Sequence, residues 1–145
     1  LELIFIDNET VNNQEYERIT AADLKPYLSD GESQVTFQVL QYRSGALNQI
    51  KEITELAESY GSMTVWDASH AAGSVRLDFK ENNIDLAVGC TYKYLCAGPG
   101  SPAWLYVSKK LQNKLFTEIK SKIKLDDTFP EYLINNKNKY SKWMS

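Results

Sequence analysis

The sequence predicts an α/β fold with three layers, in which a mostly parallel sheet carries helices on both faces. Two observations lead to this fold class. Short apolar segments that resemble strands alternate along the chain with helical segments, which is the pattern of βαβ units. The last two predicted strands follow each other too closely for a helical crossover, so we expect that pair to be antiparallel.

The first part of the chain holds two predicted strands and one short helix. Residues 1–7 (LELIFID) are apolar enough for a short buried strand, although they also fit a short helix. Thr20 is a suitable N-cap for a helix over residues 20–29, which ends before an Asp-Gly turn. Apolar residues at every second position predict a strand over residues 34–41.

The next elements form the centre of the predicted fold. Residues 46–60 are the clearest helix, because apolar residues recur at three- and four-residue steps with charged residues on the other side. Strands follow over residues 63–67 (MTVWD), 84–90 (IDLAVGC) and 102–107 (PAWLYV). A further helix is expected over residues 108–116.

Composition places the chain among ordinary globular proteins. Its 145 residues are enough for one modest domain, with 43% hydrophobic and 24% charged residues. The net charge of −3 argues against nucleic acid or an anionic membrane surface as a partner. We find no apolar stretch long enough to cross a bilayer and no leader sequence, so we expect a cytoplasmic protein. Cys90 and Cys96 fit reduced thiols better than a disulfide.

Side chains with chemical capability follow two of the predicted strands. Asp67 ends the MTVWD strand, and His70 follows three residues later. Lys93 follows the IDLAVGC strand, within TYKYLCAGPG. Ligands of open α/β sheets bind beyond the carboxyl ends of the strands. Pyridoxal phosphate (PLP) needs a lysine for a Schiff base and an acid for its ring nitrogen, so this arrangement suits PLP. His70 could orient Asp67 or stack on the ring, and Tyr92 offers a hydroxyl to the phosphate.

Each of these residues also has an ordinary structural interpretation. An aspartate at the end of a strand is commonly a turn former. A lone histidine is more often a satisfied core or surface group, and a lysine is usually a solvated charge. Tyr92 and Tyr94, which flank Lys93, could be core or edge aromatics. From the residues alone, the PLP site is therefore the minority interpretation.

Sequence strings around these residues resemble a known family. WDASHAAG and DLAVGCTYKYLCAGPGSPAWLYV, with QYRSG upstream, resemble the kynureninases, which are fold-type I PLP enzymes of the aspartate aminotransferase superfamily. Related cysteine desulfurases typically carry a histidine directly before the lysine, where this chain has Tyr92. Two positions depart from the family: Gln38 stands where a serine is usual, and Cys96 where an asparagine is frequent.

The resemblance implies a role for each candidate residue. Lys93 would hold PLP covalently and move the Cα proton of the substrate, and Asp67 would pair with the pyridinium nitrogen. His70 would lie beside the cofactor, and Tyr92 would bind its phosphate. The implied reaction is hydrolysis of L-kynurenine, or of 3-hydroxykynurenine, to anthranilate, or 3-hydroxyanthranilate, and L-alanine. No metal is expected.

The resemblance also bears on domains and partners. It predicts a partial PLP-binding large domain over residues 1–120 and a divergent polar tail over residues 121–145. We expect a small amino-acid substrate and a homodimer in the full-length form, with no nucleic acid or membrane as partner. The family's upstream phosphate-binding helix and downstream small domain are missing, so little activity is expected from this segment alone. The alternatives are a related PLP lyase, such as a cysteine desulfurase, and a non-catalytic fragment.

Overall fold

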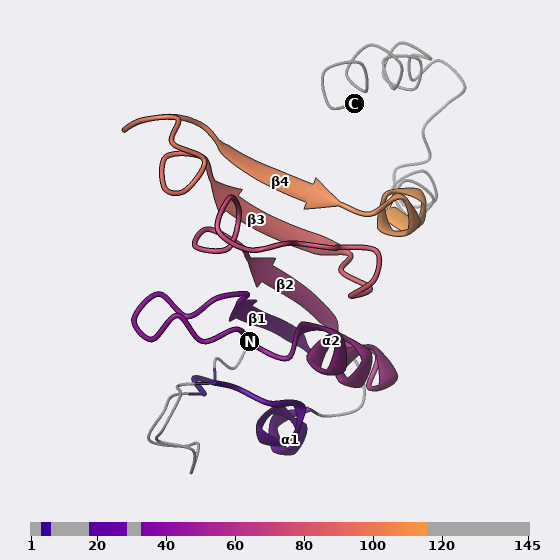
Figure 1. Cartoon of the computed structure of the whole chain (residues 1–145). Coiled ribbons are helices and arrows are strands. Elements are labelled where there is room, and N and C mark those ends of the chain that lie inside the picture. The colour runs from indigo at the N-terminus through magenta and orange to yellow at the C-terminus, as the bar shows by residue number, and fades with distance from the viewer. Residues whose placement is uncertain (1–3, 7–17, 29–32, 116–145) are drawn as a thin grey trace, which may run out of the picture. The chain divides into compact units, whose positions relative to one another are not determined.

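The structure is a computed structural model of the whole chain (Figure 1). It describes residues 4–6, 18–28 and 33–115. The strand predicted over residues 1–7 lies mostly outside these ranges, and residues 4–6 adopt no strand. The predicted tail over residues 121–145 lies wholly outside them, so the domain boundary predicted at residue 120 stays a prediction.

The chain divides into two compact units, Leu1–Ser108 and Lys109–Ser145. The second unit is described over residues 109–115, which are helical, in agreement with the helix predicted to begin near Ser108. Across the described ranges, no helix combines the length and the apolar character that crossing a membrane requires.

A four-stranded sheet forms the centre of the first unit (Figure 1). Its strands, in spatial order, are β1 (Gln34–Gln38), β2 (Met63–Asp67), β3 (Leu86–Cys90) and β4 (Ala103–Val107). β1 pairs with β2 and β2 with β3 in parallel, whereas β3 and β4 are antiparallel. This confirms the predicted mostly parallel sheet with one antiparallel strand after the lysine loop.

A short helical segment precedes β1. Helix α1 (Ala21–Leu24) runs directly into the 3₁₀ turn η1 (Lys25–Tyr27). The Asp23 carboxylate accepts hydrogen bonds from the backbone N–H of Thr20 (2.9 Å) and from its hydroxyl (2.6 Å). Thr20 therefore stands at the helix N-terminus, as predicted, and Asp23 fixes its position.

Helix α2 (Ile50–Ser59) begins later than the predicted start at Ala46. The residues before it fold back on the end of β1 instead of joining the helix. The Gln41 N–H donates to the Ala46 carbonyl over 2.9 Å, and the Asn48 N–H donates to the Val39 carbonyl over 3.1 Å. These backbone bonds to the β1 segment replace the first turn that the apolar pattern predicted.

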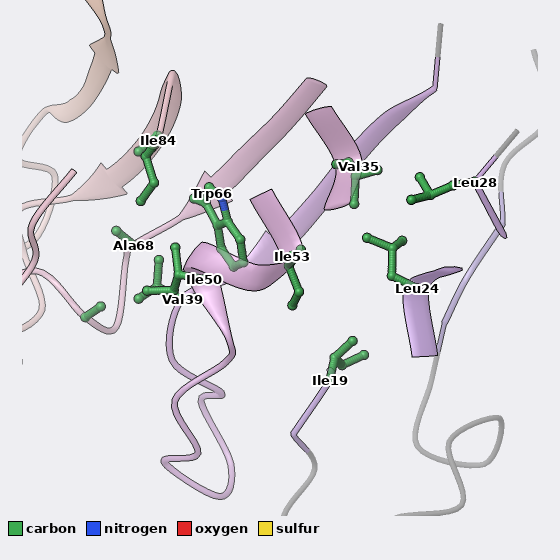
Figure 2. Packing of buried hydrophobic residues seen from close by; sticks show 13 residues of the cluster. Ile19, Leu24, Leu28, Val35, Val39, Ile50, Ile53, Trp66, Ala68 and Ile84 are labelled. Atoms are coloured by element: carbon green, nitrogen blue, oxygen red, sulfur yellow. The ribbon is translucent and has the colours of Figure 1, made fainter. Parts of the chain in front are cut away.

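The core lies on one face of the sheet (Figure 2). Trp66 of β2 is fully buried and belongs to the same cluster as Ile53 of α2. By strand register, Trp66, Ala87 and Tyr106 point to the same face. Phe79, in the segment before β3, packs on Tyr106 with ring centroids 4.5 Å apart. Both crossovers therefore cover one face, as right-handed connections that run in one direction across a sheet require.

The opposite face of the sheet is more open. Val65 and Val88 are half-buried there, and Leu105 is 60% exposed. Within the described part of the first unit, no helix covers this face, so the second helical layer stays a prediction.

A buried hydrogen bond ties α2 to the sheet. The Trp66 indole N–H donates to the Thr54 hydroxyl over 3.0 Å, and both side chains are almost fully buried. Thr54→Val keeps the side-chain shape but leaves the indole N–H unpaired, so we expect the free energy of unfolding to fall by about 1–3 kcal/mol. Urea denaturation measures this loss. Thr54→Ser, which keeps the hydroxyl, is the control, and an equal loss in both variants would contradict the account.

Candidate active site

The loops that follow β1, β2 and β3 lie at one edge of the sheet, because these strands are parallel. Figure 1 shows them on the left of the view. This is the edge at which open α/β sheets bind ligands. Asp67 is the last residue of β2, and His70 and Lys93 lie in the loops after β2 and β3. The fold thus brings the predicted residues to a single edge.

Asp67 begins a tight turn after β2. Its Oδ1 accepts a hydrogen bond from the Ser69 N–H over 2.8 Å. The N–H groups of Ala71 and Ala72 both donate to the Ala68 carbonyl, over 3.0 and 2.8 Å. Asp67 therefore has the turn-forming role that an aspartate at a strand end commonly plays. Within the described ranges, Ser69 is the one hydrogen-bond partner of the Asp67 carboxylate, so Oδ2 remains available to a ligand.

Lys93 and His70 are in direct contact. The Lys93 Nζ lies 2.8 Å from His70 Nε2 and 3.4 Å from Nδ1. Nε2 is the nearer of the two nitrogens, and it can accept a hydrogen bond from the amine in the tautomer that carries the imidazole proton on Nδ1. Both side chains are half-buried. The two residues are 23 positions apart, so this contact is made by the fold, and the sequence had not indicated it.

Tyr92 and Tyr94 are both open to solvent, with exposed fractions of 51% and 53%. Neither tyrosine is therefore a core aromatic, which leaves an edge position as their structural interpretation. The Lys93 Nζ lies 5.7 Å from the centroid of the Tyr92 ring, within the range of a cation–π contact. The Tyr92 side chain is thus next to the amine and accessible to a ligand.

The loop after Lys93 contains a residue in the left-handed backbone region. Cys96 has a φ of 56°, and its N–H donates to the Lys93 carbonyl over 3.1 Å. Asparagine tolerates this region better than most residues. Cys96, where the resemblance leads us to expect an asparagine, therefore lies at a conformationally restricted position of the loop.

Gly73 brings the β2 loop against the lysine loop. Its φ is +86°, and a Cβ atom at this position would lie 2.8 Å from the backbone carbon and oxygen of Tyr94. Only glycine permits so close an approach of the two backbones. This glycine closes the WDASHAAG string, but its partner segment could not be inferred from the residue pattern. The approach places the loop that carries His70 beside the loop that carries Lys93.

Gly73→Ala is expected to destabilise the protein more than Gly98→Ala. Both glycines have almost the same φ, +86° and +88°, so both substitutions carry the same left-handed backbone cost. A Cβ on Gly98 meets nothing within 4 Å, whereas one on Gly73 collides with the Tyr94 backbone. We expect an additional loss of about 1–3 kcal/mol in unfolding free energy for Gly73→Ala, as for overpacked interiors. Equal urea midpoints for the two variants would disagree with the described contact.

Tyr42 is a site residue that the sequence interpretation missed. Its ring centroid lies 6.0 Å from that of His70, and its N–H donates to Gln38 Oε1 over 3.3 Å. Gln38, at the position where the family usually has a serine, is therefore engaged in the turn after β1. The sequence signal that could have identified Tyr42 is the QYRSG string at the end of a predicted strand. The sequence interpretation assigns no role to a side chain of this string.

Comparison with known proteins identifies relatives of this chain. The Aminotransferase class-V family model matches residues 7–138. The kynureninase of Burkholderia mallei (strain SAVP1) is 40% identical over 91 residues, which are 63% of this chain and 22% of that protein. The kynureninase of Pseudomonas fluorescens is 40% identical over 72 residues, 50% of this chain and 17% of that protein. The chain thus spans about a fifth of the length of these relatives.

Solved structures share the fold of this chain. An apo cysteine desulfurase from Thermococcus onnurineus NA1 matches 75% of this chain and 25% of its own, with a TM-score of 0.59 and 22% identity. An alanine–glyoxylate aminotransferase from Nostoc sp. matches 68% of this chain and 26% of its own, with a TM-score of 0.56 and 20% identity. The kynureninase resemblance is confirmed, and so is the predicted α/β fold class of a mostly parallel sheet with one antiparallel strand. The chain belongs to the Aminotransferase class-V family, whose members depend on PLP.

Proposed function

We propose that this chain is the cofactor-binding segment of a kynureninase-type hydrolase. The full-length protein would cleave L-kynurenine, or 3-hydroxykynurenine, to anthranilate, or 3-hydroxyanthranilate, and L-alanine, as a cytoplasmic homodimer. The observation that carries the proposal is the contact between Lys93 and His70. These residues lie in the two strings, TYKYL and WDASHAAG, through which the chain resembles kynureninases. Tyr92 favours a kynureninase over a desulfurase, since desulfurases typically have histidine at that position.

The residues at the carboxyl edge of the sheet fit PLP. The Lys93 amine is half-buried and lies beside an exposed phenol, that of Tyr92. Asp67 Oδ2, which has no partner within the described ranges, suits the protonated ring nitrogen. The Tyr92 hydroxyl suits the phosphate. When bound, PLP supplies an electron-withdrawing ring that stabilises negative charge on the substrate carbon beside the amino group.

The chain's own residues then have defined tasks. Lys93 supplies the amine that binds the cofactor, and its Nζ takes the proton from the substrate Cα and returns it. His70 Nε2, 2.8 Å from that amine, accepts its hydrogen bond and limits the directions in which it can point. Asp67 keeps a negative charge where the ring nitrogen carries a positive one, and the Ser69 N–H holds the carboxylate in place.

An exchange of segments tests this function. In the Pseudomonas fluorescens kynureninase, the region that corresponds to residues 34–107 of this chain, which include Asp67 and Lys93, is replaced by those residues. We expect the chimera to release anthranilate from kynurenine, which its fluorescence measures, and the same chimera with Lys93→Ala to release none. A chimera that folds and binds PLP but leaves kynurenine intact would contradict the proposal. Sulfur release from cysteine by that chimera would favour the desulfurase alternative.

The isolated chain has a different expected behaviour. It spans about a fifth of the relatives' length, so the remainder of a full-length protein would have to complete the pocket. We therefore expect the 145-residue chain to bind PLP but to show little or no turnover of kynurenine by itself.

A further inference from the structure

A short turn after β1 presents an aromatic ring to the site. The Gln41 N–H donates to the Ala46 carbonyl and the Gly45 N–H donates to the Gln41 carbonyl, each over 2.9 Å. Gly45 has a φ of +74°, which glycine adopts without steric cost. The Tyr42 N–H is held by Gln38 Oε1 at 3.3 Å. These bonds fix the backbone at Tyr42, beyond the carboxyl end of β1.

The Tyr42 side chain lies against His70. The two ring centroids are 6.0 Å apart and the planes are tilted by 34°, within the range of attractive aromatic pairs. Tyr42 is 63% exposed, so its ring contributes little to the core. The contact with His70 therefore points to a role in the site and not in the stability of the fold.

The orientation of the His70 ring decides which of its nitrogens faces the amine. The Lys93 Nζ lies 2.8 Å from Nε2 and 3.4 Å from Nδ1, so both nitrogens are within hydrogen-bond distance and the ring orientation decides which one is nearer. Within the described ranges, the His70 side chain contacts Lys93 and Tyr42. A neighbouring ring restricts rotation about the His70 Cβ–Cγ bond, because a turned imidazole loses the favourable contact.

We propose that Tyr42 is a positioning residue that packs against His70, keeps Nε2 towards Lys93 and so directs the Lys93 amine. The proposal rests on the proposed function for its meaning in the reaction. Tyr42 acts through His70 and is not assigned a contact with the cofactor or the substrate.

Nuclear magnetic resonance tests the proposal directly, because His70 is the single histidine of the chain. The ¹⁵N shifts of the neutral imidazole report which nitrogen carries the proton. The wild-type chain and Tyr42→Phe, which keeps the ring, are expected to carry it on Nδ1. Tyr42→Ala and Tyr42→Leu are expected to shift the signals towards a mixture of both tautomers. Arg43→Ala, at an exposed neighbour in the same turn, should resemble the wild type.

Three outcomes would overturn the proposal. These are a wild-type chain without a dominant Nδ1–H tautomer, unchanged shifts in Tyr42→Ala and Tyr42→Leu, and a shift in Tyr42→Phe as large as in Tyr42→Ala. If Tyr42→Ala fails to fold, Tyr42→Leu supplies the decision, since it fills similar volume without an aromatic face. The spectra are recorded on the chain without PLP. Binding of PLP to Lys93 is measured in a separate experiment, and failure of that binding would contradict the proposed function.

Discussion

Lys93→Ala is expected to abolish covalent attachment of PLP to the chain. The amine that lies 2.8 Å from His70 Nε2 is the group that the proposed site offers to the cofactor aldehyde. The chain is incubated with PLP, treated with borohydride to make the bond permanent, and weighed as intact protein by mass spectrometry. We expect one added cofactor in the wild-type chain and none in Lys93→Ala.

The matched control for this substitution is Lys80→Ala. Lys80 is an exposed lysine in the same unit and outside the site, so its removal should leave the added mass unchanged. Attachment that persists at the wild-type level in Lys93→Ala would show that PLP reacts with surface lysines and would remove Lys93 from the site.

Asp67→Asn is expected to lower turnover of the kynureninase chimera by about 10²–10³-fold, the range measured when one preorganised electrostatic contact is lost. The asparagine oxygen can still accept the Ser69 hydrogen bond, so the turn after β2 is preserved. What is lost is the negative charge opposite the ring nitrogen. PLP attachment to Lys93 should persist, so the anthranilate assay and the borohydride assay should give different results for this variant.

Asp78→Asn is the matched control for the loss of charge. Asp78 is another half-buried aspartate that forms a turn, since its Oδ1 accepts a hydrogen bond from the Glu81 N–H over 3.0 Å. It lies in the segment before β3, away from the strand ends that form the site. A chimera that keeps full turnover with Asp67→Asn, or loses as much with Asp78→Asn, would leave Asp67 with a structural role only.

Local patterns predicted the sheet well, because each strand coincides with a short apolar segment of its own. β2 has the predicted bounds, and the short link between Cys90 and Ala103 correctly indicated an antiparallel pair. The start of α2 could not be predicted in this way. Asn48 has an apolar helical pattern around it, but its N–H bonds to Val39, a partner that only the folded chain brings near.

The candidate site, like the fold, could be predicted from the sequence in part. Asp67 and Lys93 could be placed from the sequence, because both follow strands whose carboxyl ends meet at one edge. The contact of Tyr42 with His70 and the close approach of Gly73 to Tyr94 could not. Each of these two contacts joins loops that follow different strands. The distance between such loops depends on backbone angles, which residue patterns do not determine.

A crystal structure of the kynureninase chimera with PLP would decide whether the Lys93 amine and the Asp67 carboxylate serve one cofactor. We expect continuous density from the Lys93 Nζ to the cofactor, with Asp67 Oδ2 within hydrogen-bond distance of the ring nitrogen. Density that joins PLP to another lysine, or an Asp67 carboxylate directed away from the ring, would contradict the account.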